Sequence, residues 1–291
     1  MPEIGSNIPK ADINLIDETF DASHSESYHL SIQTEPGRLT FCVFNTVVNK
    51  YIVLRSYPLF ITGIDKISDE WRIVIENDEL SGLHYKSSGH LWISPRCTLV
   101  PGHVFDANET DTYLTFNHGE KAGEQTLQNY IRPANLYSVF SYPEALVSLL
   151  RHYQPNIRLF HQTTPLIESL VTGISSPDKV MAIYLYSCYL DVVIVRKNEL
   201  LFYNTFRISA PEDVVYFLTG VSNLFDMDLS TIKLIYVGNT KQLPHELAVL
   251  MDYTGSIAEW ESSQEATYSH YIQASVIKDF INLFNLYGCG L

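Results

Sequence analysis

Short strand-like segments open the ordered part of the chain. Residues 28–33, 39–44 and 51–57 are rich in β-branched and aromatic side chains. Turn-forming residues separate them, first at Glu35-Pro36-Gly37-Arg38 and then near Asn49-Lys50. Short strands joined by tight turns are typical of an antiparallel meander. The pattern therefore predicts a three-stranded antiparallel sheet in which 39–44 is the middle strand.

Helices and strands alternate after this meander. Between Ile64 and Ile75, apolar residues recur at helical spacing and acidic residues fill the opposite face. The other elements predicted before residue 172 are helices at 143–153 and 165–171 and a strand at 157–160, preceded by short apolar runs at 91–93, 113–116 and 136–140. The first part of the chain therefore combines a meander with α/β units.

The same order of elements begins again after residues 173–178, whose Gly, Ser, Pro and Asp make them the best linker of the chain. Lys197-Asn198 is a tight turn, since Asn tolerates a positive φ. The later elements predicted are strands at 180–186, 189–195, 200–206, 234–237 and 257–260, and helices near 243–251 and 272–286. The repeat is one of element order, because the residues of the two halves differ.

A further helix between the third and fourth of these strands has a recognisable start. Ser209-Ala210-Pro211-Glu212 matches a capping box, with Ser at the cap and Glu three residues later. Apolar side chains follow at helical spacing, at Val214, Leu218, Val221 and Phe225. We therefore expect the Ser209 side chain to cap this helix.

Each half is thus predicted to contain a meander followed by helix, strand, helix and strand. Three antiparallel strands continued by α/β units are the arrangement of a ribonuclease-H-like domain, and two such domains in tandem form an actin-like fold. We therefore predict an α/β protein of duplicated ribonuclease-H-like domains at 15–175 and 176–291, after a loose tail at 1–14. A tandem of two unrelated α/β domains is the alternative.

Composition and charge exclude several classes of function. The 291 residues are 46% hydrophobic and 18% charged, which is typical of a globular chain with a sizeable core. The net charge of −14 predicts no binding to nucleic acid or to anionic lipid. Residues 1–14 resemble no signal peptide, and no apolar run approaches the ~18 residues of a membrane span. We expect no membrane insertion.

The cysteines indicate the compartment. Cys42, Cys97, Cys188 and Cys289 are far apart and match no zinc or redox spacing. We expect reduced thiols and a cytoplasmic location.

Four stretches carry a resemblance to a known family. They are Tyr28–Gln33, Thr98–Pro101 with Val104–Asp106, Leu201–Phe206, and Asn282–Cys289. They resemble a Bacteroidetes family known as a domain of unknown function, number 3822. The resemblance runs from about Asp17 to the C-terminus, and Asn204-Thr205-Phe206 ahead of Glu212-Asp213 is its most specific part. The chain departs from it at the end, where Gly290 follows Cys289 in place of an expected Glu. The resemblance implies an actin-like ATPase fold and supplies no catalytic residues.

The residues that an active actin-like ATPase needs are missing. Each half requires an Asp at the end of its first strand and a Gly two positions later, so that the hairpin can approach a phosphate while the carboxylate holds Mg²⁺. Neither 32–37 nor 186–191 contains Asp-x-Gly, and Gly238-Asn239 replaces the adenosine-binding Gly-Gly. We therefore predict no ATP turnover, no catalytic residue and no cofactor. The alternative is weak binding of ATP and Mg²⁺ through Gln33, Ser187 and Asp191.

Other groups of polar residues are interpreted as structural, and no metal site is predicted. His84 and His90 flank Ser87-Ser88-Gly89, which is interpreted as a polar hairpin because no third ligand is close. The remaining acidic groups are interpreted as capping or solvated loops: Asp17, Glu18 and Asp21; Asp106, Glu109 and Asp111; and Asp226 with Asp228.

Tyrosine gives the one positive indication of function. The chain has 19 Tyr against 4 Met, and Tyr combines apolar area with a polar tip suited to protein contacts. The candidates for exposure are Tyr184, Tyr186, Tyr189, Tyr268 and Tyr271. We therefore expect a non-catalytic cytoplasmic scaffold or interaction protein with a protein partner. By analogy alone, bacterial actin-like proteins that do not polymerise commonly serve membrane assemblies in this way.

Overall fold

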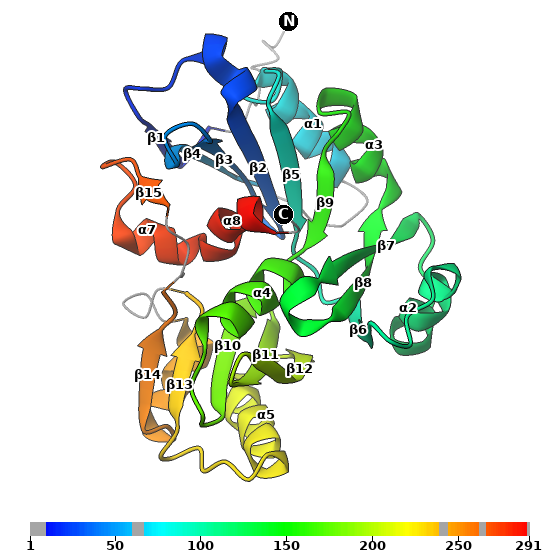
Figure 1. Ribbon diagram of the computed structural model, residues 1–291, viewed down its shortest axis with the longest axis vertical. Helices are drawn as coiled ribbons and strands as arrows, with labels where there is room; N and C mark the ends of the chain where they lie inside the picture. The colour runs from blue at the N-terminus through cyan, green and yellow to red at the C-terminus, as the bar shows by residue number, and fades with distance from the viewer. Residues whose placement is uncertain (1–9, 60–66, 239–243, 262–265, 290–291) are drawn as a thin grey trace, which may run out of the picture. The chain divides into compact units, whose positions relative to one another are not determined.

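The computed structural model describes residues 10–59, 67–238, 244–261 and 266–289. The chain forms two compact units (Figure 1). The first consists of residues 1–129, 138–162 and 265–272, and the second of 130–137, 163–264 and 273–291. The predicted domain ranges, 15–175 and 176–291, are contiguous, whereas these units exchange segments at 130–137 and 265–272.

The predicted meander forms the middle of the sheet of the first unit. β3 (Arg38–Asn45) pairs antiparallel with both β2 (Tyr28–Glu35) and β4 (Lys50–Pro58). Beyond β2, β5 (Ser87–Trp92) and β9 (Arg158–His161) continue the sheet with parallel pairing. The strand order is β1-β4-β3-β2-β5-β9, with β15 (Thr267–Tyr268) also paired to β4. The meander prediction is therefore confirmed.

The predicted loose tail is wrong at its C-terminal end. β1 (Ile13–Ile16) pairs antiparallel with β4, because Ile13, Leu15 and Ile16 supply the apolar side chains of a half-buried edge strand. Residues 1–9 lie outside the described residues.

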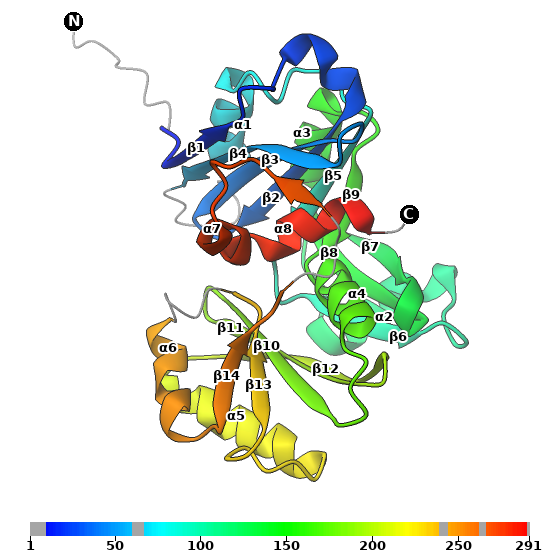
Figure 2. The ribbon, with the colours of Figure 1, turned by 60° about the vertical axis from the view of Figure 1, so that its left-hand side comes forward.

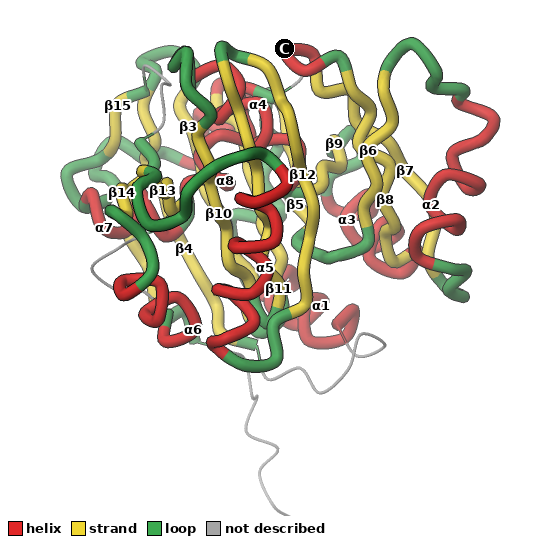
Figure 3. Tube along the Cα trace, turned by 90° about the horizontal axis from the view of Figure 1, so that it is seen from below, coloured by secondary structure: helices red, strands yellow, loops and turns green. Residues whose placement is uncertain are grey.

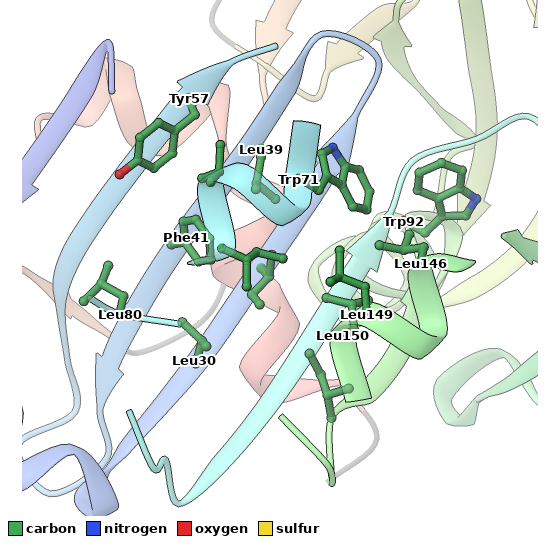
Figure 4. Close-up of a cluster of buried hydrophobic side chains, with 14 of the residues drawn as sticks. Leu30, Leu39, Phe41, Tyr57, Trp71, Leu80, Trp92, Leu146, Leu149 and Leu150 are labelled. Atoms are coloured by element: carbon green, nitrogen blue, oxygen red, sulfur yellow. The ribbon is translucent and has the colours of Figure 1, made fainter. Parts of the chain in front are cut away.

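The core of the first unit lies between one face of this sheet and two helices, α1 (Ile67–Asn77) and α3 (Glu144–Tyr153). Side chains alternate along β2, so Leu30 and Ile32 enter the core while Ser31 and Gln33 point to the opposite face. Figure 4 shows Leu30 and Phe41 on the sheet with Trp71 of α1 and Leu146 of α3 beside them.

A separate three-stranded sheet is inserted between β5 and α3. It consists of β6 (Cys97–Pro101), β7 (Glu124–Ile131) and β8 (Leu136–Pro143) in the order β6-β8-β7. The helix α2 (Thr110–His118) follows β6, so the apolar run at 113–116 is helical. Asn129 of β7 protects the edge of β9, because its amide donates to Leu159 O at 2.9 Å and accepts from His161 N at 3.2 Å.

The second unit repeats the arrangement of the first. β10 (Val180–Tyr186), β11 (Tyr189–Arg196) and β12 (Glu199–Arg207) form an antiparallel meander, and β13 (Lys233–Tyr236) and β14 (Ser256–Glu259) continue it in parallel. The order is β12-β11-β10-β13-β14, which matches β4-β3-β2-β5-β9 of the first unit (Figure 2). Its described helices are α4 (Thr163–Gly173), α5 (Pro211–Leu224), α6 (His245–Ala248), α7 (Ala274–Asp279) and α8 (Ile281–Asn285).

The repeat extends to an irregularity within the sheets. Val43 pairs with Val53 and Phe44 with Tyr51, so Ile52 is an extra residue on β4. In the second unit, Ile194 pairs with Phe202 and Val195 with Leu200, so Leu201 is the extra residue on β12. Both meanders therefore carry a β-bulge at the same place in the third strand.

Two helix predictions need correction in length. The helix expected near 243–251 is α6 followed by a 3₁₀ turn at Val249–Asp252, and Leu243 lies outside the described residues. The final helix is divided into α7 (Ala274–Asp279) and α8 (Ile281–Asn285), because Phe280 leaves helical geometry at φ −118° and ψ 25°.

The predicted cap of α5 is also wrong. The helix begins at Pro211, and the Asp213 carboxylate accepts from the backbone N–H of Ser209 at 2.7 Å and of Ala210 at 3.0 Å. Pro is favoured at the first helical position, which places Asp213 at the third position, from which a carboxylate can reach back. The cap is therefore Asp213, and neither Ser209 nor Glu212 supplies it.

Candidate functional site

The first hairpin, between β2 and β3, has Glu35 as the last residue of β2 and Gly37 two positions later, in place of an Asp-x-Gly. Gln33 stands near the end of β2 and is buried, and its amide lies 3.4 Å from Glu35 Oε1. Gly37 turns the chain at φ 84°. Burial raises the pKa of Glu35, against the opposing charge of Arg38. A buried amide and a carboxyl whose charged form is disfavoured by burial supply little to hold Mg²⁺.

The second hairpin, between β10 and β11, carries three stacked aromatic rings. Ser187 makes the turn at φ 50°. The rings of Tyr184 and Tyr186 are stacked with centroids 5.5 Å apart, and those of Tyr186 and Tyr189 with centroids 5.9 Å apart. Three tyrosine rings are therefore stacked on one face of a hairpin whose turn would have to lie open to approach a phosphate.

Asp191 lies on β11 beyond this turn and is fully buried. Its Oδ1 accepts from the Thr205 hydroxyl at 2.6 Å and from the Tyr186 hydroxyl at 3.2 Å. Thr205 is also 3.0 Å from the Tyr203 hydroxyl, which lies 3.2 Å from the Thr163 hydroxyl. Burial, together with the charge of Asp191, raises the pKa of Tyr186, so this phenol remains a donor. Asp191 therefore belongs to a buried hydroxyl network.

The network joins four elements of the second unit. Thr163 begins α4, Tyr186 ends β10, Asp191 lies on β11, and Tyr203 and Thr205 lie on β12. Buried hydrogen-bond networks of this kind fix the mutual arrangement of the elements that they join. Gln33 belongs to the first unit, whereas Ser187 and Asp191 belong to the second. The contacts described for each of them lie within its own unit.

Gly238, the single glycine found in place of Gly-Gly, has a packing reason. A Cβ atom at this position would lie 2.5 Å from the ring of Tyr236. Burial raises the pKa of Tyr236 to about 12. The ring therefore occupies the space beside the glycine backbone. Asn239 lies outside the described residues.

The segment between His84 and His90 does not form the polar hairpin that we expected, so that interpretation is wrong. Residues 87–92 form β5, and His90 is buried in the core of the first unit. Its Nε2 lies 2.8 Å from the Thr34 hydroxyl and its Nδ1 contacts the Tyr142 hydroxyl. Burial lowers the pKa of His90 to about 3. His84 is exposed, so the two histidines lie in different environments.

One acidic group gains a neighbour that the sequence could not reveal. Oxygen atoms of Asp17 and Glu18 and a ring nitrogen of His270 lie within 4.8 Å of one another. Asp17, however, pairs with Lys50 Nζ at 2.7 Å and accepts from the Thr19 hydroxyl at 2.6 Å. Although burial alone would raise the pKa of Asp17, these partners hold it well below its usual value. The lysine already supplies the cation that a metal would bring.

Asp228 caps a turn, in agreement with its interpretation, and Asp21 and Asp106, which were interpreted as solvated, cap turns as well. Asp21 accepts from Ser23 N, Asp106 from Asn108 N, and Asp228 from Ser230 N, at 2.9, 2.9 and 3.0 Å. Asp226 has φ 51° at the end of α5. These carboxylates satisfy backbone donors beside helices and turns.

The tyrosines expected at the surface differ in exposure. Tyr271 is 45% exposed, whereas Tyr186 is buried and the other three are half-buried. The prediction is wrong for Tyr186 because its ring packs within the hairpin stack. All four cysteines are free, with Cys42 and Cys289 buried. Among the helices described, none has the length and apolar character needed to cross a bilayer.

The profile of a family described as "Protein of unknown function (DUF3822)" matches residues 17–254. A Bacteroides thetaiotaomicron protein with an actin-like ATPase fold and unknown function superposes with a TM-score of 0.80 at 18% identity, over 93% of this chain and 99% of that one. The match to the PilM-PilN type IV pilus biogenesis complex has a TM-score of 0.56 at 10% identity, over 89% of this chain and 97% of that one. No curated protein matches significantly.

These similarities establish the fold. The chain has a mixed α/β, two-domain actin-like ATPase fold, as the order of its elements predicted.

Proposed function

Because the chain belongs to the DUF3822 family of proteins of unknown function, we propose that it is a non-catalytic cytoplasmic interaction or scaffold protein on a degenerate actin-like fold. The observation that carries this proposal is the use of Asp191. Its carboxylate, the acid nearest the second hairpin on its strands, is buried and accepts from Thr205 and Tyr186.

The electrostatics of both hairpins support the absence of catalysis. A nucleotide brings a tetra-anionic triphosphate, and an actin-like site balances it with Mg²⁺ held by carboxylates. Here the first hairpin offers the buried amide of Gln33 and the Glu35 carboxyl, whose charged form is disfavoured by burial, and the second carries stacked tyrosine rings next to its turn. The loss of carboxylates that could hold Mg²⁺ at the hairpins weakens nucleotide binding more than the net charge of −14 does, because distant charges are screened within about 8–10 Å.

The interaction role rests on two supports. The PilM-PilN complex is named for an assembly of type IV pilus biogenesis, so a fold of this kind is found in a protein complex. Large apolar side chains are also exposed on the surface, among them Phe116 at 88% and Tyr216 at 73%. The four free thiols suit a reducing compartment such as the cytoplasm.

A thermal melt with and without millimolar Mg-ATP tests the non-catalytic part. A ligand at 100 times its dissociation constant stabilises a fold by about 2.7 kcal/mol. For a chain of this size, that corresponds to a shift in Tm of about 5–10 °C. We expect a shift below about 1 °C.

The alternative of weak ATP binding through Gln33, Ser187 and Asp191 predicts the opposite result. A rise of several degrees that saturates with ATP and disappears with EDTA would overturn the proposal. Adenosine with inorganic triphosphate provides the matched control for a non-specific anion effect. Recovery of a stoichiometric protein partner in a pull-down from the native cell would support the interaction role, and persistent recovery of the chain alone would contradict it.

A further inference from the structure

One helix of the second unit has an outer face without charge. Along α5, Val214 and Leu218 enter the core of this unit, and Figure 3 shows α5 lying over the strands of its sheet. Tyr216 and Gly220 each follow one of these residues by two positions, a rotation of about 200°, so they lie on the opposite face with Asn223. All three outer residues are exposed, and no charged residue occurs between 214 and 225. Exposed helix faces normally carry charged side chains, so this face is unusual for one left in water.

Further large apolar side chains are exposed on the same layer of helices. α5 packs against α6 and against the 3₁₀ turn at Val249–Asp252, which share its core. Met251 is 66% exposed, and Leu224 at the end of α5 is 69% exposed. Apolar side chains gathered in this way mark an interaction site, whereas single ones do not. We call the following exposed residues the α5 surface: Tyr216, Gly220, Asn223, Leu224, Met251 and Tyr253.

Gly220, within this surface, has no packing role in its own fold. A Cβ atom added at this position would meet no atom within 4 Å, and the residue lies inside a helix, where no positive φ requires glycine. A glycine inside a helix is less stable than an alanine, because it loses more backbone freedom on folding. What Gly220 provides is a site without a side chain, on which the backbone of another helix can lie close.

The charges that border the α5 surface along the chain are acidic. Residues 211–228 and 244–253 contain six Asp or Glu and no Lys or Arg. Glu212 begins α5, Asp226 follows its end, and Asp252 lies in the adjoining turn. All three are exposed, and none forms an ion pair with any residue that the structure describes. Lys179 contacts this layer at the C-terminal end of α5, where its Nζ donates to the carbonyl of Phe225.

These charges decide between the possible occupants. A second copy of α5 would bring further acidic residues to the contact, so like charges would be added to like. We propose that the α5 surface binds an α-helix of another protein, whose contact face is apolar with a small residue at its centre and whose flanks carry Lys or Arg.

Each part of this partner answers a feature of the α5 surface. The small residue lies on Gly220, apolar side chains pack beside Tyr216 and Met251, and the basic flanks meet the acidic border. The 14 residues of α5 span about 21 Å, which four turns of a partner helix can follow. This inference rests on the proposed interaction role, for which it names the surface and the chemistry of the partner.

Fluorescence anisotropy with the full chain and a labelled synthetic helix tests the proposal. The probe has about 18 residues, with Ala and Leu on one face and Lys on its flanks. We expect saturable binding that weakens as the salt concentration rises. A probe with Glu in place of Lys should not bind, and neither should a Lys probe whose helix is broken by a central Pro. The proposal is overturned if the Lys probe shows no saturable binding, or if either control probe binds equally well.

The variant Gly220→Gln separates binding from folding. Gln forms helices better than Gly, so the variant should resist urea at least as well as the wild type. Its side chain, however, occupies the space of the partner backbone, so the dissociation constant of the Lys probe should rise by about tenfold or more. Ser148→Gln adds a side chain of the same kind at an exposed site on α3 and should bind the probe like the wild type. Equal affinities of these two variants would contradict a helix lying on Gly220.

A charge reversal distinguishes this surface from general attraction to an acidic protein. Asp252→Lys should weaken binding of the Lys probe, whereas Asp111→Lys, the same change at an exposed site on α2, should not. Equal losses in the two variants would mean that the net charge alone attracts the probe, and would overturn the proposal.

The pull-down from the native cell separates this proposal from the interaction role itself. A stoichiometric partner that is recovered equally by the wild type and by Gly220→Gln would leave the interaction role intact and overturn the α5 surface. Loss of that partner from Gly220→Gln, but not from Ser148→Gln, would support both.

Discussion

Single residues show how the chemistry of a nucleotide site is replaced by packing. Asp191 accepts from two hydroxyl groups, and His90 acts as a neutral, buried partner of Thr34 and Tyr142. Gly238 leaves room for the ring of Tyr236. Each of these residue types can serve a ligand, and each here serves its own fold. Residue types alone therefore suggest more ligand-binding sites than the fold contains, because a buried polar group needs a hydrogen-bond partner whether or not it binds a ligand.

The residues that cap α5 allow a prediction about stability. Asp213→Ala removes the acceptor for the backbone N–H groups of Ser209 and Ala210. We expect the free energy of unfolding to fall by about 0.5–2 kcal/mol, measured by urea denaturation. Ser209→Ala is the control and should change stability by less than about 0.5 kcal/mol. A larger loss in Ser209→Ala than in Asp213→Ala would restore the serine cap.

Among the elements, β15 shows how a late segment completes an early sheet. Its strand pairs with β4, and the ring of Tyr268 stacks on that of Tyr51 with centroids 5.2 Å apart. Ser269 N donates to Tyr51 O at 2.9 Å. Beside this contact, Lys50 of β4 pairs with Asp17 at the end of β1. The edge of the first sheet therefore depends on segments from both ends of the chain.

Breaking this ion pair should destabilise the protein. Lys50→Met leaves the Asp17 carboxylate buried without its cation, since the aspartate side chain has 0% exposure. The expected loss is about 1–3 kcal/mol by urea denaturation. Lys86→Met is the control, because Lys86 is exposed and donates to the Thr46 hydroxyl at 3.2 Å. The double variant Asp17→Asn/Lys50→Met should recover part of the loss; no recovery would mean that the lysine acts through its alkyl chain.

For the whole molecule, three buried histidines couple folding to pH. Burial lowers the pKa of His29 to about 4, and that of His90 and His161 to about 3, from an ordinary value of 6.5. Below pH 6.5 the unfolded chain binds these protons and the folded chain does not. Stability therefore falls as pH falls from about 6.5 toward about 4, and it is recovered when pH rises.

Urea denaturation at pH 7.0, 6.0 and 5.5 measures this effect. Three protons taken up on unfolding correspond to a slope of up to about 4 kcal/mol per pH unit. His152→Gln, at an exposed site on α3, should leave the slope unchanged. A slope near zero between pH 6.0 and 5.5 would contradict neutral, buried histidines in the fold.

The sequence by itself determined the local elements and their order. Alternating apolar residues and Pro, Gly and Asn turns predicted both meanders, and the repeat of elements predicted the fold. These features depend on neighbours along the chain, so periodicity and turn chemistry are sufficient to reveal them. The missing Asp-x-Gly was visible in the same way.

Only the tertiary structure decided how distant residues meet. The sheet inserted at 97–143, the pairing of β15 with β4 and the approach of Thr205 to Asp191 join segments whose spacing follows no period. The positions of β4 and β12 likewise became comparable only when the two bulges aligned them. Burial and hydrogen-bond satisfaction are properties of the folded chain, because the free energy of each buried polar group depends on partners that folding alone brings within reach.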